Sequence, residues 1–158
     1  MSPRPGRMRR AVESFLRADD WPYEEVPDSD ALVTAVEGRN GTWSCFIHPL
    51  EDEHQIVCYA RCPVVVPPER RAAAAEYACR ANSGLLLGCL EIDLDAGLVS
   101  VRTSVDVGDS AVGAGIIGGL LYPNAATMDA YLPGLLMVAG GDVDAAAAIA
   151  AVEQGSPD

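Results

Sequence analysis

The side chains that could bind a metal ion gather around one predicted turn. His48 and His54 flank the segment 49–53, which contains three acids. Zinc sites favour histidine and cysteine ligands at short, defined spacings, and no cysteine lies in this turn. A run of acids between two strands is also typical of a solvated loop. We therefore expect no metal ion and no cofactor here.

The cysteines are the next candidates for chemistry. Cys58 and Cys62 are separated by three residues. In an extended strand, four steps of about 3.3 Å place them roughly 13 Å apart, too far to chelate one ion. Pro63 bends the chain after Cys62, so we expect this thiol to be the most exposed. A catalytic cysteine needs a base to form its thiolate, and the sequence suggests no such pairing. No pair of acids is singled out either, so we expect no catalytic residue and no enzyme.

A glycine motif suggests a nucleotide site only on first inspection. Residues 113–118 match G-x-G-x-x-G. A dinucleotide site needs this motif after a parallel strand in a βαβ unit, whereas the strand before it here belongs to a predicted hairpin. The alternative is packing, since Gly115, Gly118 and Gly119 form a small-residue face. We expect that face to allow a close approach to another element, across a dimer in the leading hypothesis.

The charge balance excludes one class of partner. The formal net charge is −12, and all 11 basic residues are arginine. Such a chain repels phosphate backbones, which argues against nucleic-acid binding. No apolar run approaches the roughly 20 residues of a membrane helix, and the first ten residues do not resemble a secretory signal. We therefore expect a cytoplasmic protein without a membrane partner.

Period-two alternation predicts a five-stranded antiparallel sheet. Asn40-Gly41 supplies the positive φ angles of a tight hairpin turn between the first two strands. A second hairpin follows the central helix. The expected strands are 31–37, 42–48, 55–61, 86–94 and 99–105.

Helical periodicity surrounds these strands. Met8, Val12 and Leu16 recur on one face of a first helix, and the segment 69–83 forms a second helix with an alanine-rich core face. A third helical region, 111–131, is expected to break at Pro123, because proline removes a backbone donor. The fold class is therefore α+β, a single domain with the order α-β-β-β-α-β-β-α and a C-terminal helical extension.

The register of the second hairpin follows from matching its apolar faces. This matching places Leu94 opposite Val99 and Ile92 opposite Val101. In that register Glu91 lies directly opposite Arg102. An exposed ion pair of this kind contributes at most about 1 kcal/mol, so we expect it to set register and not to catalyse.

Several motifs together resemble the YbjN family, described as bacterial sensory transduction regulators. They run in order from about residue 12 to residue 140, most of the chain. The motifs are Gly38-x-Asn40-Gly41-x-Trp43, Pro63 to Arg71, Arg80-Ala81-Asn82, Gly88 to Asp93, Gly97, Arg102 and Tyr131-Leu132-Pro133-Gly134. Leu90 stands where the pattern favours an aromatic residue, and the alanine-rich extension is outside the pattern.

The resemblance implies a fold similar to type III secretion chaperones, commonly dimeric, over residues 7–140, with residues 141–158 as an extension and tail. It implies regulation or chaperoning and transfers no catalytic residue. Our leading hypothesis is a non-enzymatic, dimeric module of bacterial signal transduction or stress response, which binds another protein by strand addition or apolar contact. Candidate partner-binding residues are Trp43, Leu87 and Cys89 on the second face of the sheet, although Trp43 equally suits the core.

Two alternatives remain open. One is a small-molecule sensor with a pocket between the helix 69–83 and the sheet, which requires a cavity with convergent polar groups. The other is an enzyme that uses Cys62 or a carboxylate, which requires a cleft with a strongly perturbed pKa.

Overall fold

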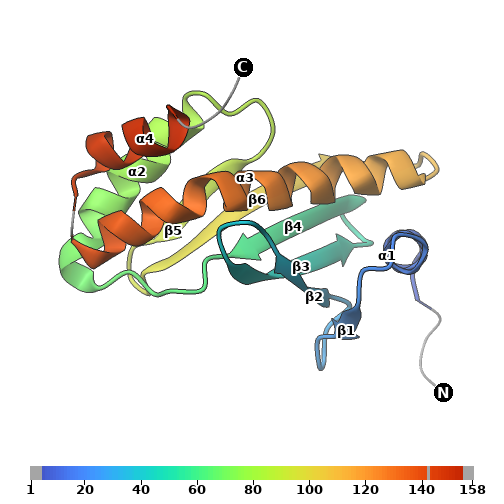
Figure 1. The fold of residues 1–158 in the computed structure, drawn as a ribbon. Coiled ribbons are helices and arrows are strands. Elements are labelled where there is room, and N and C mark those ends of the chain that lie inside the picture. The colour runs from blue at the N-terminus through green and yellow to red at the C-terminus, as the bar shows by residue number, and fades with distance from the viewer. Residues whose placement is uncertain (1–4, 142, 155–158) are drawn as a thin grey trace.

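The computed structural model describes residues 5–141 and 143–154, and it has the predicted α+β class (Figure 1). One antiparallel sheet has the strand order β1-β2-β3-β4-β6-β5. The helices pack on it, so the class and the single domain are confirmed. The elements are α1 Arg7–Ala18, β1 Tyr23–Glu25, β2 Leu32–Glu37, β3 Thr42–Leu50, β4 Gln55–Arg61, the 3-10 turn η1 Pro68–Arg70, α2 Arg71–Asn82, β5 Cys89–Asp93, β6 Leu98–Asp106, α3 Ala114–Gly140 and α4 Ala145–Glu153.

The sheet has six strands, so the expected number of five was wrong. The additional strand is β1, which pairs with β2 over three residues, from Tyr23↔Thr34 to Glu25↔Leu32. A three-residue segment is too short to show alternation, and tertiary contacts hold it instead. The hydroxyl of Thr34 donates to the carbonyl of Pro22 at 2.6 Å.

The helix α3 runs unbroken through Pro123 and Pro133, contrary to the expected break. Pro133 has no N–H to donate to the carbonyl of Asp129, four residues earlier. The side-chain amide of Asn40 donates to that carbonyl at 2.8 Å. The turn between β2 and β3 therefore supplies the hydrogen bond that proline removes, which no local rule could anticipate.

The expected register of the second hairpin was wrong by two residues. The structure pairs Ile92 with Val99 and Leu90 with Val101. A shift of two keeps every side chain on its predicted face, so the apolar pattern cannot distinguish the two registers. The strand also begins at Cys89 instead of Leu86, whose side chain is 97% exposed.

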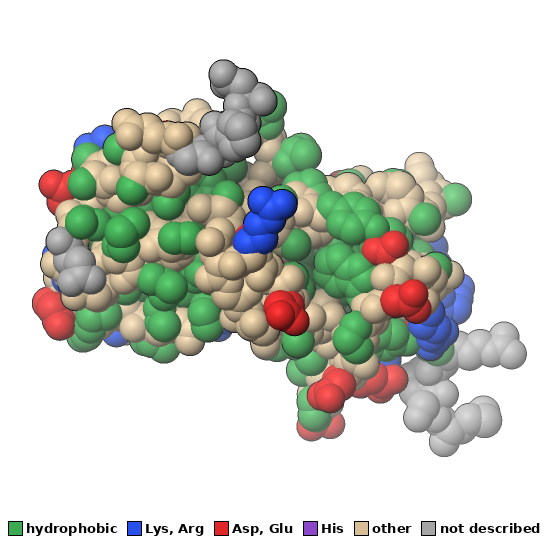
Figure 2. Space-filling model, in the orientation of Figure 1, with side chains coloured by type: hydrophobic (Ala, Val, Ile, Leu, Met, Phe, Trp, Pro, Cys, Tyr) green, Lys and Arg blue, Asp and Glu red, His purple; other side chains and the backbone are tan. Residues whose placement is uncertain are grey.

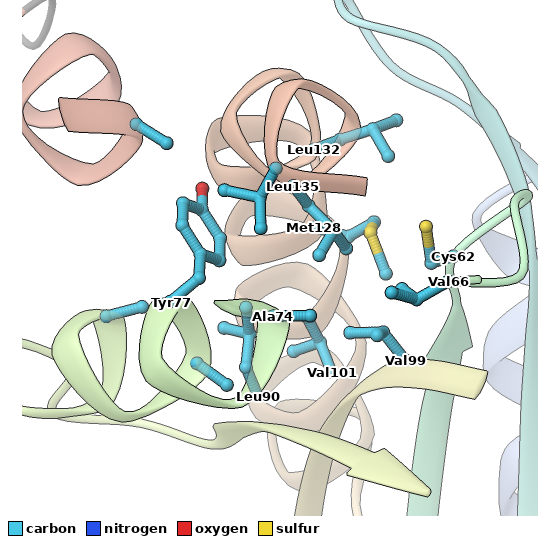
Figure 3. Close-up of a cluster of buried hydrophobic side chains, with 14 of the residues drawn as sticks. Cys62, Val66, Ala74, Tyr77, Leu90, Val99, Val101, Met128, Leu132 and Leu135 are labelled. Atoms are coloured by element: carbon cyan, nitrogen blue, oxygen red, sulfur yellow. The ribbon is translucent and has the colours of Figure 1, made fainter. Parts of the chain in front are cut away.

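The helices cover one face of the sheet and form two buried clusters with it. In the first, Tyr77 of α2 packs among residues of α3 and the strands (Figure 3). Its hydroxyl donates to the carbonyl of Tyr131 at 2.7 Å, and a Cβ added at Gly134 would lie 2.4 Å from its oxygen. Only glycine fits beneath this ring. Ala145 and Ala148 of α4 belong to the same cluster.

The second cluster joins α1 to β3 and the start of α3. The carboxylate of Glu51 accepts from the backbone N–H groups of Met8 and Arg9, at 2.9 and 3.0 Å. These N–H groups belong to the helix N-terminus and have no partner within the helix. One acid of the turn 49–53 therefore caps α1, and is not simply solvated.

Candidate functional site

No helix or strand of the described residues covers the face of the sheet opposite the helices. Along β2, β3, β4 and β6 buried side chains alternate with more exposed ones, and the exposed set points away from α1 and α3. We call this set the open face. It includes Val33, Ala35, Ser44, Phe46, His48, Val57, Tyr59, Arg61, Cys89, Glu91, Arg102 and Ser104, together with Ser100, which points the same way but is only 6% exposed.

The register aligns these residues in rows across the strands. The central row runs from Val33 through Phe46, Tyr59 and Arg102 to Cys89. Neighbouring strands lie about 4.8 Å apart, so the row spans roughly 19 Å. It has an apolar and aromatic part over β2 to β4, and a charged part over β6 and β5.

Arg61 is held in place by neutral groups. Its Nε donates to the Ser100 hydroxyl at 3.0 Å, and its guanidinium carbon lies 6.0 Å from the Phe46 ring centroid. Among the described residues it forms no ion pair. The open face of this strongly acidic protein therefore includes an arginine, Arg61, that is fixed in orientation but has no carboxylate partner among the described residues.

Arg102 is held differently. Its Nε donates to Glu91 at 3.1 Å, across a diagonal of the sheet, and Nη2 lies 3.6 Å from the Cys89 sulfur. The hydrogen bond to Glu91 raises the pKa of Arg102 above its usual value. The predicted contact between these two residues is thus present, although Cys89 and not Glu91 lies directly opposite Arg102.

His48 completes the aromatic part. Its ring lies edge-to-face against Tyr59, with centroids 5.7 Å apart. Burial lowers the pKa of His48, because partial removal from water disfavours the imidazolium. At neutral pH His48 is therefore an uncharged, amphipathic contact.

The open face has shallow relief. One depression of about 290 Å³ lies on the side of Arg61, and another of about 380 Å³ on the side of Val57 and Ser104. Tyr59 and Glu91 line both. Such a broad surface suits a protein segment better than an enclosed small molecule.

The structure places the three candidate partner-binding residues in three environments. Cys89 is half-buried on the open face, and Leu87, 60% exposed, precedes β5 in a loop. Trp43 is only 3% exposed and points into the helix-covered core, with no partner for its indole N–H. The structure therefore gives Trp43 the core position, and we leave it out of the proposed surface.

The three candidate dimer glycines also separate. A Cβ at Gly118 would lie 3.2 Å from the Tyr122 ring and 3.5 Å from Phe15, so its small size serves packing within the chain. A Cβ at Gly115 or Gly119 would meet nothing within 4 Å. Only these two glycines leave free surface on α3.

Cys62 is not the most exposed thiol, so that expectation was wrong. It is 4% exposed, and burial raises its pKa. Its N–H donates to Val99 and extends the pairing of β4 beyond Arg61, which turns the side chain inward. Cys79, on the outer side of α2, is the exposed cysteine. In the described part of the chain, no three His, Cys, Asp or Glu side chains gather as a metal site requires.

The space between α2 and the sheet is occupied by packed side chains. Ala74, Tyr77 and Ala81 are at most 1% exposed, and they face Leu90 and Val101 in the first cluster. The geometry gives the small-molecule pocket no support.

Residues from different motifs of the family pattern contact one another. Asn40 bonds Asp129 beside the Tyr131–Gly134 motif, and a Cβ at Gly41 would lie 2.8 Å from Leu132. The Asn82 side chain bonds both backbone groups of Leu90, at 2.7 and 2.9 Å. These residues join helices to the sheet, and the motifs therefore specify the fold more than any chemistry.

A six-stranded antiparallel sheet with helices on one face and an open second face defines an α+β domain with a surface suited to binding. The family model YbjN, described as "Putative bacterial sensory transduction regulator", matches residues 9–137. The chain belongs to this family. No curated protein shows significant similarity to the chain.

A solved structure has the same fold. It is the crystal structure of YbjN from E. coli, titled "a putative transcription regulator", with a TM-score of 0.56. The two sequences are 12% identical, and the match covers 84% of this chain and 90% of the other. In the described part of this chain, no helix has both the length and the hydropathy of a membrane span.

Proposed function

We propose that this protein is a non-enzymatic, cytoplasmic regulator that binds a segment of another protein on the open face of its sheet. The observation that carries the proposal is the uncovered central row, in which Phe46 and Tyr59 lie beside Arg102, with Arg61 in the adjacent row. Aromatic residues and arginine are the residue types enriched where proteins bind one another.

The two outermost strands, β5 and β1, favour binding on the face over strand addition at their edges. At β5 the Asn82 side chain occupies both backbone groups of Leu90, which a strand added at that edge would need. At the other edge β1 is short and carries Glu24 and Glu25. Short, charged or covered edges are the usual protection against strand pairing.

The charges indicate the chemistry of the bound segment. Arg61 offers a guanidinium without an acidic partner, whereas Arg102 is already paired with Glu91. The segment that fits presents apolar side chains to Phe46 and Tyr59, and a carboxylate to Arg61.

Arg61→Glu tests this proposal, with Arg39→Glu as the matched control. Arg39 is exposed in the turn between β2 and β3, away from the open face. Quantitative pull-downs from lysate of the source bacterium, read by mass spectrometry, should show a stoichiometric protein with wild type and Arg39→Glu. Arg61→Glu should reduce it at least about tenfold, because a close charge pair across an interface becomes repulsive. Equal retention by Arg61→Glu contradicts the proposal.

We include a dimer through α3 in the proposal. Asp129 is the one charged residue among the 27 of this helix. A Cβ at Gly115 or Gly119 would meet nothing within 4 Å, so the helix surface is open at these two positions. A charge-poor surface lets two copies with a net charge of −12 meet without like-charge contacts. Gly119→Glu should give a monomer by sedimentation equilibrium, whereas Arg39→Glu should not. A monomeric wild type contradicts the dimer and leaves the open-face proposal intact.

A further inference from the structure

One stretch of strand edge lacks the protection found at β5. The pairing of β1 ends at Tyr23↔Thr34, so no strand lies beside β2 from Ala35 to Glu37. On this edge the N–H of Val26 donates to the carbonyl of Ala31. Because successive residues of a strand direct their backbone groups to opposite edges, Ala35 and Glu37 direct theirs outward, as Ala31 does. Among the described residues, the N–H of Ala35 donates to no other element, and its carbonyl accepts only a long hydrogen bond, 3.5 Å, from the Thr34 hydroxyl. These groups are thus available to a further strand.

A notch in the surface lies at this free edge. It has a volume of about 270 Å³ and is lined by Asp19, Asp20, Trp21, Pro22 and residues 34–37. We call it the β2-edge notch. In Figure 2, hydrophobic side chains lie between acidic ones in the area where α1, β2 and α3 meet.

The aromatic wall of the notch is fixed before any partner arrives. The Trp21 ring lies 6.1 Å from that of Tyr122, edge-to-face, and Tyr122 packs in the same way on Phe15 at 5.8 Å. Asp19 accepts from both the indole N–H of Trp21, at 2.8 Å, and the hydroxyl of Tyr122, at 2.5 Å. A rigid aromatic contact loses little conformational entropy on binding, so it is an effective anchor.

The rim of the notch selects a positively charged occupant. Asp20 and Glu37 line it, and neither forms an ion pair among the described residues. Of the residues that the structure describes, no arginine lines the notch. An acidic segment would be repelled here, whereas lysine or arginine side chains on either side of the wall would be attracted.

We propose that the β2-edge notch binds an extended, basic segment of another protein, which adds as a short strand beside Ala35–Glu37. The segment places one apolar side chain against Trp21 and its basic side chains near Asp20 and Glu37. Backbone hydrogen bonds supply affinity in this mode, and the side-chain contacts supply selectivity. The site uses the backbone edge of β2 and the side chains of Trp21 and Asp20, none of which belongs to the open face, although the Ala35 side chain does.

The test begins with peptides selected on the wild-type protein from a random library of 12 residues displayed on phage. Selected peptides should be rich in arginine or lysine next to an apolar residue. In NMR titrations they should shift the amide resonances of Ala35 to Glu37 and the indole resonance of Trp21. Peptides that shift only other residues, or that carry no excess of basic residues, overturn the proposal.

Two variants and one modified peptide separate the proposed contacts. Ala35→Pro removes the free N–H, and edge strands tolerate proline, so binding should weaken at least about tenfold with the fold retained. Asp20→Asn should weaken it about threefold, and asparagine suits the φ of +55° at this position. Two versions of the best peptide carry methyl groups on every second backbone nitrogen, one on the odd-numbered residues and one on the even-numbered residues. One of the two versions should lose its binding. These peptides leave the protein unchanged, so undiminished binding of both versions overturns strand addition whatever the variants do.

Discussion

The two faces of the sheet are built from the same strands but differ in burial and composition. On β3, Ile47 is fully buried beneath the helices, whereas its neighbour Phe46 is half-buried on the open face. On β4 the same is true of Cys58 and Tyr59. The covered face is mostly apolar and closely packed, and it holds the helices. The open face combines aromatic rings with arginine, a composition that a core would not require. Alternate residues of one strand can therefore meet separate demands: stability on the covered face and, in our proposal, recognition on the open face.

The largest contrast we predict is in thiol reactivity. Cys45 and Cys58 are buried on the covered face, where burial raises the pKa of Cys45 to about 12 and that of Cys58 well above its usual value. Cys79 is exposed. Because the buried thiols react only after the structure opens, they should be labelled on the order of 10³-fold more slowly than Cys79, or slower still. Iodoacetamide labelling read by peptide mass spectrometry measures this, and rapid labelling of Cys58 would show that the covered face is loose.

Alanine substitutions at neighbouring positions of β3 should separate the contributions of the covered face and the open face to the free energy of unfolding. Ile47→Ala should lower the free energy of unfolding by about 2–5 kcal/mol, because it leaves a cavity among buried side chains. Phe46→Ala should cost about 1 kcal/mol, since its ring is already partly in water. Urea denaturation gives both values. Equal losses would mean that the open face is a second core, and not a surface available for binding.

A smaller effect concerns the junction of Asn40 with α3. Asn40→Ala removes from the carbonyl of Asp129 the donor that replaces the missing N–H of Pro133; because this contact is exposed, the cost should be about 0.5–1 kcal/mol. In a Pro133→Ala background a helical N–H is available, so the same substitution should cost less. A double-mutant cycle in urea measures the coupling. Equal costs in both backgrounds would refute this account of the unbroken helix.

The smallest effect should be the pH dependence from His48. Its pKa in the folded protein is below the value of 6.5 that applies when it is unfolded. Between these two values the unfolded chain binds more protons, so stability falls as pH decreases below about 6.5 and levels off beneath the folded pKa. Comparison of wild type with His48→Gln, by urea denaturation from pH 5 to 7.5, isolates this contribution. The opposite slope would place His48 next to an acidic group.

The sequence was sufficient for the strands whose faces differ in polarity. Alternation located β2, β3 and β4, and the Asn40-Gly41 pair located their first turn. It could not locate β1, whose position depends on Thr34 and on the end of α1. Nor could it reveal that Asn40 compensates for Pro133, because the two lie 93 residues apart in the sequence.

The candidate site was predictable only in part. Period-two alternation is enough to assign Cys89 to the second face of the sheet. It cannot say which face the helices cover, and for this reason Trp43 was an ambiguous candidate. The importance of Phe46, Tyr59 and Arg61 became visible only once the register placed them side by side. Alternation and charge in β4 were the signals that could have indicated them.

Site-specific photo-crosslinking from the open face tests the central claim most directly. A photoreactive amino acid at Tyr59, in cells of the source bacterium, should capture one discrete partner protein, and Arg61→Glu in the same chain should remove that product. The matched probe at Cys79, on the outer side of α2, should not capture it. The account predicts this difference between the two positions. Capture of the same protein from both positions, or of none from Tyr59, would contradict the assignment of the open face as the binding surface.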